Sequence, residues 1–139
     1  MSCVFCEVIA GRQGATKILD EPGVVAFLDT SPVFKGHVLV VPRAHHETLV
    51  DVPERLLAPL FSTVQRVQVA VMAALDAKGT FVAMNNVVSQ SVPHLHVHVI
   101  PRTKGDGLKG FFWPRVKYES SEEYEDYASR IRGALAEPE

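Results

Sequence analysis

Apolar and polar residues alternate along the segment His94-Leu95-His96-Val97-His98, which continues into Val99-Ile100-Pro101. A two-residue period predicts a half-buried β-strand. On such a strand the three histidines share one face, and Leu95, Val97 and Val99 enter the core on the other. Half of the six histidines of the chain lie in this row. We therefore expect the row to carry chemistry, not only to pack.

Helical spacing of apolar residues predicts three helices. The longest spans Pro53 to Ala77, and Pro59 inside it implies either a kink or a start near Ala58. A short helix is expected at Phe5–Ala10, ending at Gly11. A last helix is expected at Ser120–Leu135, with Ser120 or Ser121 as N-cap and Glu123 placed for a capping box.

Short apolar runs bounded by turn residues predict five strands, at Lys17–Leu19, Val24–Leu28, His37–Val41, Thr80–Met84 and Pro93–Ile100. The order of strands, long helix and strands indicates an α+β fold. We expect a five-stranded antiparallel sheet with one long helix packed on it, a short N-terminal helix and a C-terminal helix.

The composition of the chain excludes several classes of function. The chain has 139 residues, 47% of them apolar and 22% charged, which suits one globular domain. A net charge of −2 gives no overall footprint for nucleic acid. The N-terminus does not look like a signal peptide, and no run was expected to reach the roughly 20 apolar residues of a membrane span. We therefore expect a cytoplasmic protein without nucleic-acid or membrane partners.

The charges are unevenly distributed. Residues 101–118 carry five basic side chains and one acidic one, whereas residues 119–139 carry seven acidic and two basic ones. A basic segment directly after the histidine row would suit an anionic substrate, and it would equally suit a solvated loop.

The histidine row has three interpretations on local grounds. The first is an ordinary polar strand face. The second is a metal site, because His-x-His on a strand can present two ligands to zinc. The third is a nucleophilic site with one attacking imidazole. Cys3-x-x-Cys6 has the spacing of half a zinc site. The alternative interpretation is that these two cysteines have no functional role. A disulfide would not persist in the cytoplasm.

Four ordered blocks resemble the histidine triad superfamily. The first is the His-φ-His-φ-His-φ-φ signature at 94–100, where φ is apolar. The others are residues 3–11, 26–32 and 36–45, which follow one another as in the family. Together the blocks cover residues 3–102. The closest likeness is to the small nucleotide-binding, bacterial-type branch with an N-terminal Cys-x-x-Cys.

The resemblance implies a hydrolase that cleaves at the α-phosphorus of nucleoside phosphoramidates or related nucleotide conjugates. His96 would attack and form a nucleotidyl-histidine, which water then releases as a nucleoside monophosphate. His98 would contact the α-phosphate and serve as a donor on the leaving-group side, and His37 would support the triad by hydrogen bonding. Alternatives are hydrolysis of diadenosine polyphosphates and a non-catalytic nucleotide-binding or sensing module.

The resemblance also implies the binding residues. A purine nucleotide or nucleotide conjugate would contact Asp29 through its ribose, and its phosphate or leaving group would contact Asn85, Gln90 and Ser91. Phe5 and Thr30 would line the base pocket. A structural zinc would be held by Cys3, Cys6, His45 and His94, leaving His46 as an exposed spare, and no organic cofactor is implied.

Two regions depart from the family pattern. The loop Asn85–Gln90 is short and has Ser89 where glycine is usual, although glycine tolerates positive φ far better, and Pro93 replaces a common aromatic. The cluster Phe111-Phe112-Trp113 is a core patch, a dimer interface or a lid over the base, and of the first two we favour the interface of a homodimer. We expect residues 1–139 to form one histidine triad domain, with core 3–102, loop 103–118 and helix 119–137 as an appendage.

Overall fold

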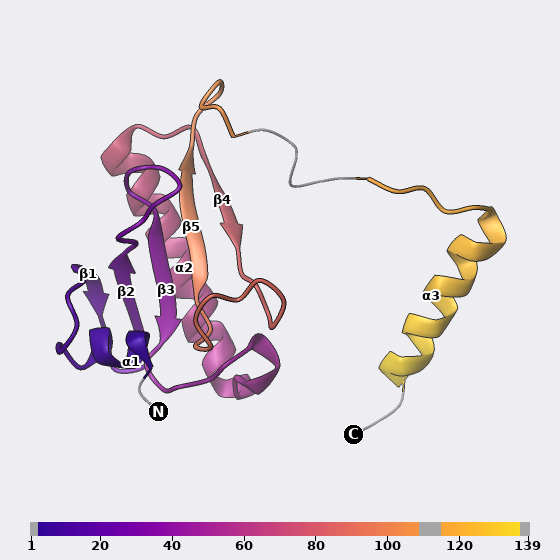
Figure 1. Cartoon of the computed structure of the whole chain (residues 1–139), viewed down its shortest axis with the longest axis horizontal. Helices are drawn as coiled ribbons and strands as arrows, with labels where there is room; N and C mark the ends of the chain where they lie inside the picture. Colours follow the sequence, from indigo (N-terminus) through magenta and orange to yellow (C-terminus); the bar gives the residue numbers. More distant parts are fainter. Residues whose placement is uncertain (1–2, 109–114, 137–139) are drawn as a thin grey trace. The chain divides into compact units, whose positions relative to one another are not determined.

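The computed structural model of the chain describes residues 3–108 and 115–136, which belong to two compact units, Met1–Asp106 and Gly107–Glu139. The first unit contains two helices, a short 3-10 turn and five strands (Figure 1). In chain order they are α1 (Val4–Ile9), β1 (Lys17–Asp20), β2 (Val24–Leu28), β3 (Val38–Pro42), η1 (Leu49–Asp51), α2 (Glu54–Leu75), β4 (Gly79–Ala83) and β5 (Val97–Arg102). The second unit contains the helix α3 (Ser121–Ala136).

The five strands form one antiparallel sheet in the order β1-β2-β3-β5-β4. The long helix α2 contacts β2, β3, β4 and β5 and so covers one face of the sheet. The α+β fold expected from the sequence, with its single long helix and short terminal helices, is confirmed.

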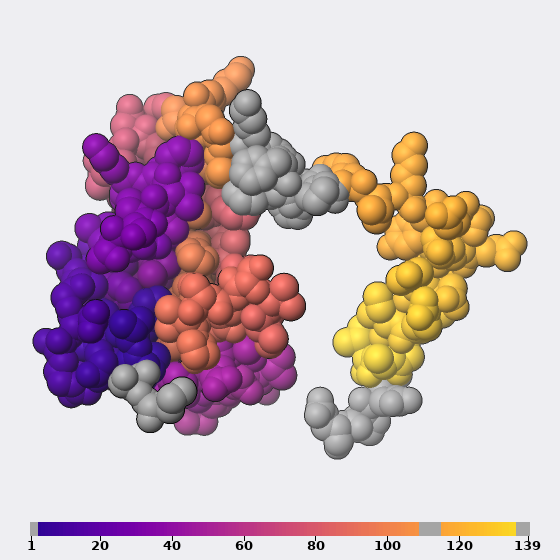
Figure 2. Space-filling view, in the orientation of Figure 1, coloured from indigo at the N-terminus to yellow at the C-terminus, as the bar shows by residue number. Residues whose placement is uncertain are grey.

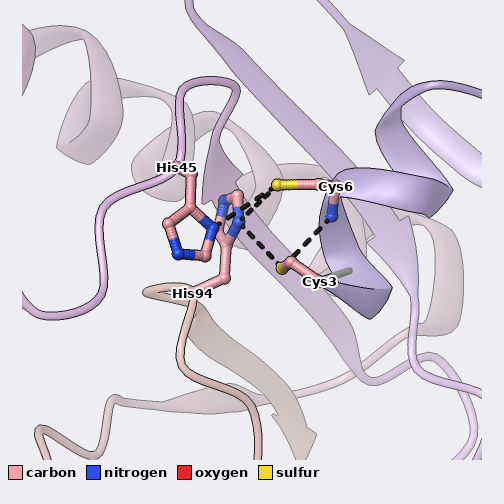
Figure 3. Close-up of side chains that lie close together, drawn as sticks. All are labelled: Cys3, Cys6, His45 and His94. Atoms are coloured by element: carbon pink, nitrogen blue, oxygen red, sulfur yellow. Dashed lines mark hydrogen bonds between the residues drawn. The ribbon is translucent and has the colours of Figure 1, made fainter. Parts of the chain in front are cut away.

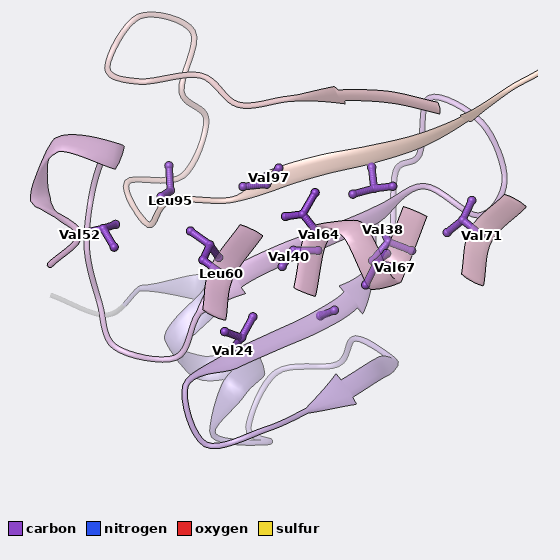
Figure 4. Close-up of a cluster of buried hydrophobic side chains, with 12 residues drawn as sticks. Val24, Val38, Val40, Val52, Leu60, Val64, Val67, Val71, Leu95 and Val97 are labelled. Carbon is purple, nitrogen blue, oxygen red and sulfur yellow. The ribbon is translucent and has the colours of Figure 1, made fainter. Parts of the chain in front are cut away.

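Alternation along the central strands divides the core into two layers. Val38 and Val40 of β3 pack toward α2, in a cluster that also contains Leu60, Val64 and Val67 of that helix (Figure 4). Leu39 and Val41 point to the other face, where they pack with Phe5 and Val8 of α1. Because both faces are covered, β2 and β3 are apolar throughout.

Helix α2 runs without interruption from Glu54 to Leu75, so the alternative of a start near Ala58 is wrong. By length and composition alone it could also cross a membrane, with a mean hydropathy of 1.3, which the sequence analysis did not anticipate. In this fold its apolar stripe, including Leu60 and Val71, is instead buried on the sheet.

The strand that carries the histidine row begins later than expected. β5 starts at Val97, so His94 and His96 precede it. The amide of His94 donates to the carbonyl of Val92 in a turn, and the amide of Leu95 donates to the carbonyl of His46, not to β3. The alternation still holds, because Leu95 joins Val97 and Val99 in the core.

Other boundaries shift by one to three residues. His37 precedes β3, because its amide closes a turn onto the carbonyl of Phe34. In α3, the hydroxyl of Ser120 accepts the amide of Glu123, and the carboxylate of Glu123 accepts the amide of Glu119. Ser120 is therefore the N-cap of α3, one of the two residues expected.

Candidate active site and metal centre

The histidine segment and helix α1 meet on the face of the sheet opposite α2. Phe5 of α1 packs edge-on against His96, with ring centroids 5.0 Å apart, and against Phe27 of β2 at 5.2 Å. His98 lies in β5, and its ring centroid is 5.0 Å from that of His96. Residues from three distant parts of the sequence thus form one site.

A backbone carbonyl fixes the tautomer of His96. Its Nδ1 lies 2.8 Å from the carbonyl oxygen of His94. Because a carbonyl only accepts hydrogen bonds, Nδ1 must carry the proton. The lone pair of neutral His96 is therefore on Nε2, which is the nitrogen available to attack an electrophile.

A relay of two hydrogen bonds orients His98. The amide of Val33 donates to Nδ1 of His37 at 3.1 Å, which leaves the proton of neutral His37 on Nε2. That nitrogen donates to Nδ1 of His98 at 2.9 Å. The proton of neutral His98 is then on Nε2, where it can be donated to a bound anion.

Burial keeps the supporting histidines neutral. Desolvation, together with the neighbouring His96 and His37, lowers the pKa of His98 to about 4. Desolvation also lowers the pKa of His37, although the carboxylate of Asp29 opposes the shift. At neutral pH, His98 therefore acts as an uncharged hydrogen-bond donor.

A cavity of about 250 Å³ opens at these histidines. Both apolar and polar side chains line this cavity. The predicted site residues that line it are Phe5, Asp29, Thr30, Ser91, His96 and His98. Asp29 is fixed by the amide of Ser31, which donates to its Oδ1 at 2.8 Å. An apolar wall for a flat ring, a carboxylate and two imidazoles together suit a nucleotide.

Several lining residues were not predicted from the sequence. Val8, Phe27, Leu39 and Ser31 also line this cavity. Phe27 and Leu39 belong to the second face of apolar strands. The two-residue period of a strand predicts that these side chains share one face of the sheet, but it does not reveal which face holds the ligand.

The second predicted cluster, Cys3, Cys6, His45 and His94, also comes together (Figure 3). Nδ1 of His94 lies 3.5 Å from each of the two sulfurs, and Nδ1 of His45 lies 3.4 Å from Sγ of Cys6. Zn–S and Zn–N bonds of about 2.3 and 2.0 Å in a tetrahedron imply S···N separations of roughly 3.6 Å. The separations therefore fit a tetrahedral zinc ion.

The protonation of the cluster also fits a metal. Nε2 of His94 lies 2.8 Å from the carbonyl of Pro42 and must donate to it, so the Nδ1 lone pair faces the sulfurs. Burial and the neighbouring Cys3 raise the pKa of the Cys6 thiol to about 11. A bound metal would displace that proton, so metal affinity should rise with pH.

A third group, Asp29, His37 and His98, is equally close together but does not fit a metal. Nδ1 of His37 accepts the amide of Val33, so its Nε2 carries the proton and has no lone pair to offer. This group is a hydrogen-bond relay, in which Asp29 Oδ2 lies 3.6 Å from Nε2 of His37.

The side chains of two predicted phosphate contacts, Asn85 and Gln90, are hydrogen-bonded to backbone groups of the protein. The side-chain amide of Asn85 donates to the carbonyl of Ser89, and that of Gln90 donates to the carbonyl of Glu47 at 2.6 Å. The carbonyl oxygen of the Gln90 side chain accepts the amide of Val87. Neither residue lines the cavity, whereas Ser91 does.

The loop from Asn85 to Gln90 is strained. Val87 and Ser89 have φ angles of 71° and 63°. Positive φ is uncommon for serine and a clear outlier for a β-branched residue. His46, expected to be exposed, is partly buried beside this region. The aromatic residues Phe111-Phe112-Trp113 lie outside the described residues.

Comparisons with known proteins agree with this geometry. A family model described as the HIT domain matches residues 10–105. A crystal structure of a HIT family member from Bacillus subtilis superposes with a TM-score of 0.88 at 33% identity, covering 99% of this chain and 100% of that chain.

Two further relatives have more specific names. An adenosine 5′-monophosphoramidase from Schizosaccharomyces pombe is 31% identical over 82% of this chain and 84% of its own length. A zinc-bound histidine triad protein from Mycobacterium smegmatis superposes with a TM-score of 0.74 at 32% identity, covering 99% of both chains.

Proposed function

This chain belongs to the HIT domain family, and from that premise we propose that it hydrolyses nucleoside phosphoramidates or related nucleotide conjugates. The observation that carries the proposal is the free Nε2 of His96 at the cavity, fixed by the carbonyl of His94. Relatives named as nucleotide hydrolases, among them the monophosphoramidase of fission yeast, support the same class of reaction.

The proposed reaction has two in-line steps. Nε2 of His96 attacks the α-phosphorus and forms an N–P bond while the P–N bond to the leaving amine breaks, and the departing nitrogen takes a proton from solvent. Water then attacks the phosphorus, the electron pair of the N–P bond returns to Nε2, and the proton of the water goes to solvent. The nucleoside monophosphate is released.

His98 stabilises the charge that develops on phosphorus. Because its pKa is lowered to about 4, it is neutral and donates Nε2–H to a non-bridging oxygen instead of giving up a proton. Asp29 would accept hydrogen bonds from the ribose hydroxyls, and Phe5 and Phe27 would pack on the base. Ser91 would donate its hydroxyl to the phosphate.

We also propose that Cys3, Cys6, His45 and His94 hold a structural zinc ion, as in the bacterial-type branch with Cys-x-x-Cys. Zinc would supply no chemistry at phosphorus. It would tie the first turn of α1 to the loop at His45 and to the start of the histidine row. The tetrahedral spacing of the four ligand atoms supports this assignment.

The test is hydrolysis of adenosine 5′-phosphoramidate by the parent and by His96→Ala and His96→Asn. We expect the variants to lose at least about 10³-fold in kcat, because no other group can form the covalent intermediate, and to retain binding of AMP. Mass spectrometry of the acid-quenched parent should show a nucleotidyl adduct that both variants lack. A parent that binds AMP without turnover would instead indicate a binding module.

A further inference from the structure

A second cavity adjoins the proposed nucleotide cavity. It has a volume of about 300 Å³ and shares Val4, Ser91 and Val92 with the first one. Figure 2 shows the indigo surface of the N-terminal segment beside the salmon surface of the loop between β4 and β5. Beyond the shared wall, the second cavity is lined by Glu47 and Pro93 and by Cys3 and His45, two of the proposed metal ligands.

The two cavities meet where a phosphate would bind. The first cavity is lined by the apolar rings of Phe5 and Phe27, by Asp29, and by the proposed phosphate contacts His96, His98 and Ser91. Ser91 belongs to both cavities. A nucleotide conjugate that places its phosphorus at His96 can therefore extend its other substituent past Ser91 into the second cavity.

The second cavity is chemically selective. Val4, Val92 and Pro93 give it an apolar wall, and Glu47 is the one acidic side chain among the described residues that line it. The Glu47 backbone is held in place, because its carbonyl accepts the side-chain amide of Gln90 at 2.6 Å. Two thiolates and a divalent metal at Cys3 and Cys6 would cancel in charge, so the carboxylate of Glu47 would dominate the local field.

We infer that this cavity is a leaving-group subsite for apolar amines with a cationic tip, and that Glu47 determines this specificity. The inference rests on the proposed function. A carboxylate attracts an ammonium group that has reached it along an apolar wall. It repels a polyphosphate, so Glu47 also disfavours dinucleoside polyphosphates as substrates.

The experiment uses three adenosine 5′-phosphoramidates whose leaving amines have alkyl chains of equal length. The chains end in an ammonium group, a methyl group or a carboxylate. The parent is compared with Glu47→Gln and Glu47→Lys, and Glu54→Gln, an exposed acid at the start of α2, is the matched control. Turnover is measured as kcat/KM, and binding is measured by calorimetry in the His96→Asn background.

We expect the parent and Glu54→Gln to prefer the ammonium-tipped substrate over the methyl-tipped one by about fivefold, the scale of a partly exposed charge pair. Glu47→Gln should abolish the preference, and Glu47→Lys should move it to the carboxylate-tipped substrate. A parent without preference, or a preference that Glu47→Gln retains, would overturn the inference.

The two proposals fail in different ways. If the parent hydrolyses no amidate but binding in the His96→Asn background still follows the charge at position 47, the subsite stands and the proposed hydrolysis is wrong. If all three amidates are hydrolysed and bound equally, the hydrolysis stands and the subsite is wrong. If none is bound, both are wrong.

Discussion

The three histidines of the row differ in the hydrogen bonds that their ring nitrogens make. His94 donates to the carbonyl of Pro42 and turns a lone pair to the cysteines, whereas His96 donates to the carbonyl of His94 and keeps a free Nε2. His98 accepts from His37 and so presents N–H. Contacts with the Pro42 carbonyl, the His94 carbonyl and the His37 ring, which the local pattern does not contain, thus support our proposal that three equal imidazoles serve as a metal ligand, a nucleophile and a donor.

The lowered pKa of His98 predicts a loss of stability in acid. Its pKa is about 4 in the folded protein and about 6.5 in the unfolded chain, so the unfolded chain binds more protons between these values. Stability therefore falls as the pH is lowered from 7 to 5. After screening by solvent, this one group should account for about 1 kcal/mol.

Urea denaturation at pH 7, 6 and 5 measures this effect. The variant His98→Asn keeps an acceptor near His37 but has no imidazole to titrate, so its stability should fall less over the same range. His37 and His94 also have lowered pKa values, so the variant should still lose some stability in acid. Parallel curves for the two proteins would contradict the assignment to His98.

The strained loop offers a stabilising substitution. Val87 has a φ of 71° and is 75% exposed, so Val87→Gly relieves the backbone without removing buried surface. We expect a gain of about 0.5–1 kcal/mol in the free energy of unfolding, measured by thermal and urea denaturation. Val88 is 78% exposed and has no positive φ, so Val88→Gly should lose about 0.5–1 kcal/mol. Equal effects at both positions would exclude strain as the cause.

At the scale of elements, α1 connects the proposed metal cluster to the proposed nucleotide cavity. Cys3 is its N-cap, since its sulfur accepts the amide of Cys6, and Phe5 and Val8 on the same helix line the cavity. A helix of six residues is not stable alone and depends on tertiary contacts. A metal held by the proposed ligands would therefore position the apolar wall of the proposed base pocket.

Loss of the metal should then weaken nucleotide binding. Cys3→Ser removes a thiolate but retains an N-cap, because serine also accepts the amide at the third helical position. We expect this variant and His45→Ala to lose zinc by elemental analysis and to bind AMP roughly tenfold more weakly by calorimetry. His46→Ala alters the histidine beside the cluster that is not a ligand, and it should retain both. Full AMP affinity without zinc would show that α1 is held by packing alone.

Periodicity predicted the elements better than the loops between them. Helix α2 and the alternating strands were predictable because their burial repeats over many residues, as in the cluster that joins Val38 and Val40 to Val64. The side-chain roles of Asn85 and Gln90 were not, since they depend on carbonyls at Ser89 and Glu47 that only the folded loop brings near. The proposed roles of residues in zinc binding and phosphate binding were predicted from the family resemblance, not from periodicity.

For the whole molecule, we propose that two copies of this chain form a homodimer through β4 and the outer face of α2. β4 is an edge strand, with β5 its sole ladder partner among the described residues. The edge strand of a sheet is a site for strand pairing between chains. Val82 on β4 is 38% exposed and Val69 on α2 is 65% exposed, and these two elements contact each other. Each of these two contacting elements therefore presents an exposed apolar side chain.

Val69→Lys and Val82→Lys should break this dimer while leaving the fold intact, because both side chains are exposed in the single chain and lysine on an edge strand opposes pairing. Light scattering during size exclusion should give the parent about twice the 15.3 kDa of one chain, and the variants about one chain mass. Val50 is 91% exposed in η1, which belongs to neither element, so Val50→Lys should remain dimeric. Circular dichroism of all three checks that they are folded. A monomeric parent would end the proposal. A dimer that survives both substitutions would place the interface elsewhere, since an edge strand that pairs across two copies cannot tolerate a charge at its apolar contact.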